Sequence, residues 1–398
     1  MKRPWEFTLS TRVVFGRGSR SRLGEVAASW GRRALLVGYR QCPPLESAYL
    51  EAADRLATAG LAVETFLEVD GEPDWRLPVA GAERARAFAA DVVVGLGGGS
   101  ILDLAKGIAV LAAAGGHPWD YVGANRQGRS ADAALPIVAL PTTAGTGSEV
   151  TSVAVFTFQG VGDTPESPLK ASIGGPALRP KVALVDPELI ESCPPRWTAA
   201  CGVDALAHAI EAHICRNANP VASLLAQRAV REIDARLVAA VAGEAEPGDW
   251  DALALAATLA GAAFNESGVT VTHALSHALG ALLGIPHSEA VALGTPLNLR
   301  FNAEAARPRL AELADVCGLA PGSSEEDRAA AFIEHVIGRL RALGIPQRVA
   351  TDRPVTEALL NQLARNAAGG TVVAVALNPR RANHAALVDL FRALLGQG

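Results

Sequence analysis

The first half of the chain alternates between apolar runs and stretches with helical spacing. The apolar runs are rich in Val, Ile and Leu and lie at 30–40, 62–69, 90–97, 134–141 and 181–185. The stretches that repeat apolar residues every three or four positions lie at 47–61, 79–90 and 101–115. Near-continuous apolar strands separated by helices favour a parallel sheet covered on both faces. An earlier segment, 7–19, predicts a short strand that ends in a turn.

The pattern changes after Pro194. From Thr198 onward the chain carries Ala- and Leu-rich stretches with helical spacing and almost no alternation of the kind that strands show. We therefore expect an α/β domain at 1–190 and an all-helical domain at 191–398. The length agrees with two domains, because single hydrophobic cores stop growing at about 250–300 residues.

Composition and charge exclude several classes of protein. The chain is 49% hydrophobic with a net charge of −5, which gives no electrostatic basis for binding nucleic acid. No apolar run reaches the roughly 18–20 uncharged residues that a membrane span needs, and the first residues lack the apolar core of a signal peptide. The five cysteines are scattered, as is typical of reduced thiols. We therefore expect a cytoplasmic protein with neither nucleic-acid nor membrane partners.

Three glycines stand between an apolar strand and the helix that follows it. Gly97, Gly98 and Gly99 precede Ser100. Glycines let the backbone approach a ligand closely, and the helix start offers free N–H groups and a positive dipole end, so a diphosphate suits this turn. The alternative is a simple tight turn in which Ser100 and Asp103 form a capping box. The segment matches neither a Walker loop nor a full GxGxxG pattern.

A second polar loop, LPTTAGTGSEVTS at 140–152, follows another apolar strand. It places six hydroxyl side chains within eleven residues. The carboxyl ends of parallel strands share one edge of a sheet, which is where open α/β sheets bind ligands. The two loops together predict a nucleotide site.

Five ligand-type side chains occur in pairs or close together in the helical half. Asp204 and His208 are four residues apart, as are His273 and His277, so each pair shares a helix face. His287 follows a proline shortly after the second pair. One carboxylate and three imidazoles form a complete ligand set for a divalent transition metal. Spacing alone does not separate His273 from His277, and the alternative for each ring is a hydrogen-bonded core histidine.

Several segments, taken in order, match the pattern of one known family. They are GLGGGSILDLAK (95–106), PTTAGTGSEVT (141–151), Lys170, ALVDPEL (183–189), GVDALAHAIEA (202–212), THALSHALGALLGIPH (272–287) and NPR (378–380). In this ordered set the chain resembles the iron-containing (group III) alcohol dehydrogenase family along almost its whole length. The resemblance implies a Rossmann-like dinucleotide-binding domain, an all-helical domain and an active site in the cleft between them, the dehydroquinate synthase-like architecture.

The resemblance also implies roles for single residues. Asp204, His208, His273 and His287 would hold the metal, usually Fe²⁺ and sometimes Zn²⁺. His277 would lie beside the nicotinamide and the substrate, where we expect it to relay a proton, the alternative being a structural ring. The cofactor residues would be Gly97, Gly98, Gly99 and Ser100 at the pyrophosphate, with Asp103, Thr142, Thr143, Thr146 and Lys170 lining the rest.

The end of the second predicted strand departs from the pattern of the NAD-using relatives. They often carry an acidic residue there, whereas this chain has Gly38, Tyr39 and Arg40. We expect Tyr39 and Arg40 to contact the cofactor, and Arg40 to offer a 2′-phosphate a charge-assisted partner. The chain should therefore use NAD(P), with NADP(H) accepted at least as well as NAD(H).

These features predict a metal-dependent, NAD(P)-dependent alcohol dehydrogenase or aldehyde reductase that acts on a small primary alcohol or aldehyde. A second hypothesis is a maleylacetate-reductase-like enzyme for an acidic keto substrate, because Ser288 and Glu289 are similar to that branch; the branch tends to lose the metal carboxylate that Asp204 keeps here. A dehydroquinate synthase-type lyase and a non-catalytic binding protein are less favoured hypotheses. We expect a homodimer or a higher homo-oligomer.

Overall fold

The part of the chain that the computed structural model describes comprises residues 4–123, 128–161 and 167–396. It forms two compact units. The first unit, which contains the sheet, comprises residues 9–194 and 246–258 within these limits. The second unit is helical and comprises residues 4–8, 195–245 and 259–396. The division at Pro195 lies close to the predicted boundary near residue 190, but the segments 4–8 and 246–258 group with the other unit.

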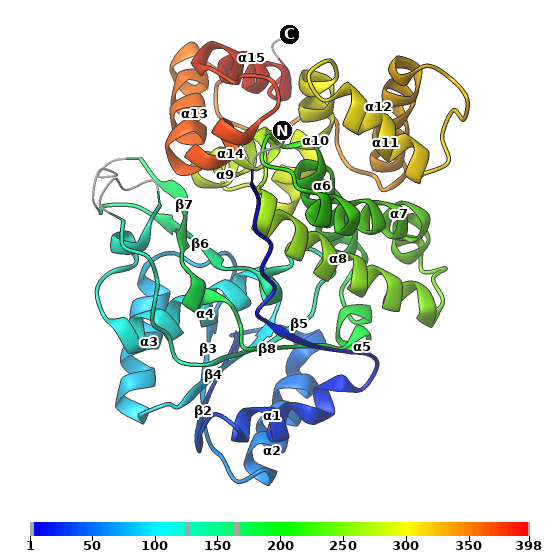
Figure 1. Cartoon of the computed structure of the whole chain (residues 1–398). Coiled ribbons are helices and arrows are strands. Elements are labelled where there is room, and N and C mark those ends of the chain that lie inside the picture. Colours follow the sequence, from blue (N-terminus) through cyan, green and yellow to red (C-terminus); the bar gives the residue numbers. More distant parts are fainter. Residues whose placement is uncertain (1–3, 124–127, 162–166, 397–398) are drawn as a thin grey trace. The chain divides into compact units, whose positions relative to one another are not determined.

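A parallel sheet of six strands forms the centre of the first unit, counted over the described residues (Figure 1). In spatial order its strands are β1 (Arg12–Phe15), β8 (Val182–Val185), β5 (Ile137–Pro141), β4 (Val92–Gly97), β2 (Arg33–Tyr39) and β3 (Ala62–Val69). The helices of this layer are α1 (Leu23–Ala28), α2 (Glu46–Thr58), α3 (Arg76–Phe88) and α4 (Gly99–Ala114). Short 3₁₀ segments are η1 (Ser19–Arg22), η2 (Pro43–Leu45), η3 (Pro118–Tyr121), η4 (Ser148–Val150) and η5 (Pro176–Leu178). The predicted α/β fold with a parallel sheet is confirmed.

Both faces of this sheet are buried, which explains why its strands are almost wholly apolar. Leu36 of β2 packs in one cluster with residues of α1 and α2, whereas Leu35 and Val37 pack in another with residues of α3 and α4. Side chains of a strand alternate between faces, so a strand covered on both sides needs apolar residues at every position.

An antiparallel pair of strands, β6 (Val153–Phe158) and β7 (Leu169–Gly174), was not predicted from the sequence. Along β6, Ala154, Phe156 and Phe158 are buried while the residues between them are half-buried. This alternation is the pattern of a strand with one covered face. The pair matters for the site because β7 carries Lys170.

The second unit is built from helices, as predicted. They are α6 (Pro195–Ile214), α7 (Pro220–Ala242), α9 (Val271–Leu283), α10 (His287–Asn302), α11 (Arg307–Val316), α12 (Glu325–Ala342), α13 (Glu357–Gly370), α14 (Val372–Leu377) and α15 (His384–Leu394). Helix α8 (Pro247–Ser267) begins in the first unit and ends in the second. Every residue of α6 from Thr198 to Ile214 is buried, so this helix lies in the core. Its many alanines and one glycine let neighbouring helices approach it closely.

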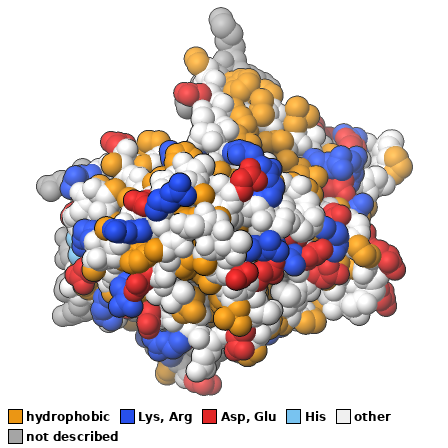
Figure 2. Space-filling view, turned by 90° about the horizontal axis from the view of Figure 1, so that it is seen from below, with side chains coloured by type: hydrophobic (Ala, Val, Ile, Leu, Met, Phe, Trp, Pro, Cys, Tyr) orange, Lys and Arg blue, Asp and Glu red, His pale blue; other side chains and the backbone are white. Residues whose placement is uncertain are grey.

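The hydropathy of the helices and the charges on the surface bear on two classes of partner, membranes and nucleic acids. Within the described residues, no single helix is long and apolar enough to cross a membrane; α8 and α9 meet that test only as a pair, and the pair is bent by 101°. On the face seen in Figure 2, basic and acidic side chains are interspersed among the drawn residues. That face therefore offers no continuous field of one sign for a polyanion.

Asp186 is a fully buried carboxylate at the end of β8. It caps the short helix α5 (Pro187–Glu191) by accepting the N–H of Glu188 at 3.1 Å. It also accepts the N–H groups of Gly18 at 3.1 Å and Arg20 at 3.2 Å, and the Arg20 guanidinium at 2.8 Å. One buried charge thus joins the turn after β1 to the start of α5.

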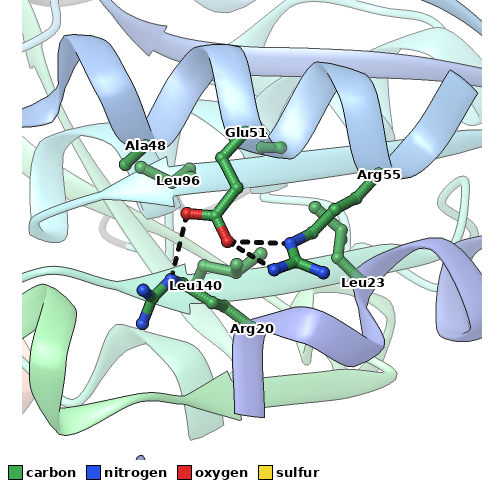
Figure 3. Close-up of a pocket in the computed structure, with 8 residues that line it drawn as sticks. Arg20, Leu23, Ala48, Glu51, Arg55, Leu96 and Leu140 are labelled. Atoms are coloured by element: carbon green, nitrogen blue, oxygen red, sulfur yellow. Dashed lines mark hydrogen bonds and ion pairs between the residues drawn. The ribbon is translucent and has the colours of Figure 1, made fainter. Parts of the chain in front are cut away.

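The Arg20 guanidinium extends this network to α2. Its Nε lies 3.2 Å from Glu51, which also pairs with Arg55 at 2.7 Å (Figure 3). The ion pairs border a small pocket whose apolar wall includes Leu23, Leu96 and Leu140. We interpret this pocket as part of the packing between α2 and the sheet.

Replacing Asp186 by Ala should destabilise the first unit. The change removes the shared acceptor of three backbone N–H groups and the Arg20 guanidinium, so we expect the free energy of unfolding to fall by about 3 kcal/mol and the Tm by roughly 5–10 °C. Thermal unfolding followed by circular dichroism measures this. The exposed Arg22–Glu25 pair supplies the control, since Glu25→Ala should leave the Tm unchanged. Equal Tm values for the two variants would contradict the role given to Asp186.

Candidate metal and cofactor site

In the helical unit, three histidine side chains converge on one oxygen of the Asp204 carboxylate. Asp204 and His208 lie one turn apart on α6, His273 lies near the start of α9, and His287 is the first residue of α10. The distances from Asp204 Oδ1 are 3.8 Å to His208 Nδ1, 3.5 Å to His273 Nε2 and 3.9 Å to His287 Nε2. One ligand atom each from Asp204, His208 and His273 lies within 4.8 Å of the others, a spacing that a single ion can bridge.

Local chain geometry brings His287 to this group. Helix α9 ends at Gly284, whose φ of 70° is left-handed, a conformation that glycine adopts without strain. Pro286 then precedes the first turn of α10 and cannot continue α9. The chain therefore reverses between His277 and His287, and the two rings come to 5.5 Å between centroids.

The burial of these atoms argues for a cation. Asp204 is fully buried, and neither of its carboxylate oxygens has a hydrogen-bond partner among the described residues. His273 Nε2 likewise lacks one within that part of the chain. Buried polar atoms are normally satisfied, and an ionised carboxylate is costly to bury unless it is paired or bound to a metal. One oxygen and three imidazole nitrogens fit Fe²⁺ or Zn²⁺.

The electrostatics keep the carboxylate ionised. Burial alone would raise the pKa of Asp204, but the imidazoles of His208, His273 and His287 outweigh it and hold this pKa well below its usual range. Burial would likewise lower the pKa of His273, yet the carboxylates of Glu211 and Asp204 raise it to about 9. The site therefore attracts a positive charge.

Glu211 contacts this site but was not among the site residues predicted from the sequence. Its Oε2 pairs with Nδ1 of His273, and its Oε1 accepts the Thr270 hydroxyl and, at 3.0 Å, the N–H of Thr272. Burial opposes ionisation, but the charge of His273 and these hydrogen bonds lower the pKa of Glu211. A carboxylate on the second ring nitrogen orients a metal-binding histidine. The sequence did contain a feature that could have indicated Glu211, because this residue follows His208 by three positions and therefore lies on the same helix face.

His277 occupies a different position from His273, although spacing could not separate them. The described contacts to Asp204 come from His208, His273 and His287. His277 lies one turn further along α9, is 4% exposed, and has its ring beside that of His287. His277 thus neighbours the group rather than belonging to it.

The glycine loop and the hydroxyl loop come together in the first unit. A Cβ added at Gly98 would lie 3.2 Å from the Tyr39 hydroxyl and 3.3 Å from Cγ2 of Thr143. A Cβ at Gly99 would lie 2.5 Å from Cγ2 of Thr146, closer than real contacts allow. The absence of side chains therefore lets these residues crowd around the first N–H groups of α4, the geometry of an anion cradle.

Two further expected residues flank this cradle. Thr142 is buried, and its N–H donates to the Gly97 carbonyl at 3.1 Å, which joins the ends of β5 and β4. Ser100 lies in the first turn of α4. The N-cap of this helix is Gly98, which provides no side-chain cap, so Ser100 and Asp103 do not form a capping box.

Asp103 and Lys106 hold the hydroxyl loop against α4. The Asp103 carboxylate accepts the Ser148 hydroxyl at 2.6 Å and the Val155 N–H at 2.8 Å. Lys106 is fully buried and donates to the hydroxyls of Ser148 at 2.7 Å and Thr151 at 2.9 Å. Burial lowers the pKa of Lys106 to about 8. Lys106 was not among the predicted site residues. The feature of the sequence that could have indicated it is a lysine in a helix whose other residues are mostly apolar.

The two basic cofactor candidates both have acidic partners. Lys170 is buried on β7, with Nζ 2.6 Å from Glu72 Oε2. Arg40 follows β2 and pairs with Glu68 and with Asp70, each at 2.8 Å. Glu68 lies near the end of β3 and Asp70 directly follows it, so their pairing with Arg40 could not be read from the sequence. The positive charge of Arg40 is therefore compensated by its neighbours.

Comparisons with known proteins agree along both units. Residues 10–187 match the family model of the iron-containing alcohol dehydrogenases, and residues 198–395 match that of the C-terminal part of the Fe-containing alcohol dehydrogenase family. The chain is 34% identical to an NAD-dependent methanol dehydrogenase of Bacillus methanolicus (91% of this chain, 92% of that protein). It is also 34% identical to a 1,3-propanediol dehydrogenase of Citrobacter freundii (91% of each). The solved structure of an archaeal halo-thermophilic alcohol dehydrogenase from a Red Sea brine pool superposes with a TM-score of 0.91 at 28% identity, covering 99% of this chain and 100% of that one. The chain therefore belongs to the iron-containing alcohol dehydrogenase family and is an oxidoreductase of the alcohol dehydrogenase class.

Proposed function

We propose that the chain catalyses metal-dependent hydride transfer between NAD(P)(H) and a small primary alcohol or aldehyde. The observation that carries the proposal is the convergence of a buried, unsatisfied Asp204 carboxylate with the rings of His208, His273 and His287. The glycine cradle beside Tyr39 supports the cofactor assignment. Similarity to dehydrogenases named for methanol and 1,3-propanediol supports a short alcohol as substrate.

Each part has a distinct task in the reaction. A divalent cation such as Fe²⁺ or Zn²⁺ supplies Lewis acidity, and the nicotinamide accepts or supplies the hydride. Asp204 contributes the negative charge that retains a cation, and Glu211 fixes the tautomer of His273 through its Nδ1. The first N–H groups of α4 and the hydroxyls of Thr143 and Thr146 would hold the phosphates of the cofactor.

His277 handles the proton. Oxidation of an alcohol releases one proton that must reach solvent, and an imidazole can accept and pass it near neutral pH. His277 is nearly buried, but its ring neighbours that of His287, whose side chain is 22% exposed. Assembly into a homodimer or a larger homo-oligomer and a cytoplasmic location stay predictions.

Metal binding should depend on Asp204 and Glu211 to different degrees. Asp204→Ala removes a ligand and should abolish measurable Zn²⁺ binding and activity, whereas Glu211→Gln should weaken binding by about 10–100-fold. Chelator competition and metal analysis of the purified protein measure both. Glu232→Gln is the matched control, since Glu232 is also buried in the helical unit but pairs with arginines. A chelated wild type that keeps full activity would contradict the metal-dependent mechanism.

Removing His277 should slow proton transfer while the metal stays bound. His277→Ala should lower kcat for alcohol oxidation by roughly 100-fold. An imidazole acts as a base only in its neutral form, so oxidation by the wild type should quicken with rising pH around neutrality and the variant should lose that pH dependence. His384→Ala, at an exposed position, serves as the control. A His277→Ala variant with an unchanged pH profile would make the ring structural.

Cofactor choice should respond to the carboxylates beside Arg40. The sequence favours NADP(H) at least equally with NAD(H), but a 2′-phosphate must displace Glu68 and Asp70 from Arg40. Glu68→Gln combined with Asp70→Asn should raise kcat/KM for NADPH about fivefold, because each exposed ion pair is worth up to about 1 kcal/mol, and change NADH little. Glu64→Gln, which breaks the exposed pair with Arg84, is the control. A wild type with a tenfold or larger preference for NAD(H) would contradict the NADP(H) expectation.

A further inference from the structure

A row of buried amide side chains leads away from Glu211. Asn298 donates to Glu211 Oε1 at 3.0 Å, the oxygen opposite to the one that holds His273. Asn302, one turn later on α10, donates to the Asn298 carbonyl at 3.1 Å and also to its side-chain oxygen. Asn302 and Asn378 then exchange two hydrogen bonds, of 3.0 and 2.8 Å. The row joins the Glu211 carboxylate to Asn378, which lies 76 residues beyond Asn302 in the chain.

The burial of this row fixes its orientation. Asn298 is 1% exposed, and Asn302 and Asn378 are fully buried. A buried amide that loses its partners costs roughly 1–3 kcal/mol, so rotating one amide would leave donors facing donors. Flipping both amides together would preserve the reciprocal bonds between Asn302 and Asn378, but the backbone of Arg380 excludes this, because its N–H donates to Asn302 Oδ1 and its carbonyl accepts from Asn378 Nδ2. Asn298 is therefore held with its Nδ2 toward Glu211.

The far end of the row is a turn that reaches the surface. The Arg380 N–H donates to Asn302 at 3.0 Å, and Asn378 donates to the Arg380 carbonyl at 2.6 Å. The same Asn378 accepts the N–H of Val271, the first residue of the helix that carries His273. The exposed Arg380 guanidinium covers the ring of Phe301. The turn thus holds His273 from two sides, through Glu211 and through the start of α9.

We propose that Asn302 and Asn378 are positioning residues of the metal centre, which act through Asn298 and Glu211 on the direction of His273 Nε2. The inference rests on the proposed metal site. Without the three asparagine amides, Oε1 of Glu211 loses one of its hydrogen-bond donors and the carboxylate can rotate. Nε2 of His273 is then no longer held in its direction toward Asp204. Because coupling is reciprocal, a bound cation should in turn stabilise the turn at 378–380.

The first test measures metal affinity and geometry rather than activity. Zn²⁺ affinity of the chelated protein is determined by competition, and Co²⁺ is added to record its ligand-field spectrum. Asn302→Leu should weaken Zn²⁺ binding about tenfold and shift the Co²⁺ spectrum, and Asn302→Ser, which leaves room for a water, should do the same to a smaller extent. Leu299→Ala, at an equally buried position on α10, should destabilise the protein without changing the spectrum. Failure of the wild type to bind either metal would instead refute the proposed function.

A double-mutant cycle separates positioning from general stability. If Asn302 acts through Glu211, then Asn302→Leu should change Zn²⁺ affinity little once Glu211→Gln is present. Additive losses in the double variant, or a wild-type-like Co²⁺ spectrum in Asn302→Leu, would overturn the proposal.

A measurement on the unmodified chain covers the case in which neither asparagine variant folds. Hydrogen exchange of the peptide that contains 378–380 is compared with and without saturating Zn²⁺. Slower exchange with Zn²⁺ supports the coupling, and identical exchange refutes it even when Zn²⁺ binds tightly.

Discussion

The charge of Asp204 is the constraint around which the helical unit is organised. Helix α6 is buried from Thr198 to Ile214, and this carboxylate lies inside it without a hydrogen bond from the described residues. Such a charge persists only if other groups compensate it, and three imidazoles from three helices do so. The small side chains of α6 let α10 approach it closely. The function of the unit and its tight packing thus depend on the same residues.

In the sheet-bearing unit, too, a buried charge depends on the groups that surround it. Lys106 is buried in α4, and its ammonium is satisfied by hydroxyls and a carbonyl of the loop that follows β5. Glycines at the start of α4 leave the backbone N–H groups accessible to phosphate, while the buried ammonium determines where the hydroxyl loop lies. In each unit a buried charge orders the residues that a ligand would contact, so binding needs little further rearrangement.

Family membership narrows the functions that the sequence left open. Belonging to the alcohol dehydrogenase family disfavours the lyase and the non-catalytic binding protein. The acidic-substrate hypothesis rested on Ser288 and Glu289, and Glu289 pairs with Arg196 of the same unit. The relatives support an alcohol or its aldehyde as the class of substrate.

The sequence by itself determined the α/β and helical halves, because hydrophobic periodicity reports which face of each element is covered. It also determined that carboxylate and imidazole ligands gather in two helical segments, since i, i+4 spacing is a property of one helix. The resemblance assigned His273 rather than His277 to the metal, which spacing alone could not do, and the tertiary structure brings His273 to Asp204. Only the tertiary structure decided that Glu211 lies behind His273. Likewise, it was only the tertiary structure that placed Glu68 beside Arg40. Periodicity within an element carries no information on which distant element it meets, so pairings between segments depend on how the whole core packs.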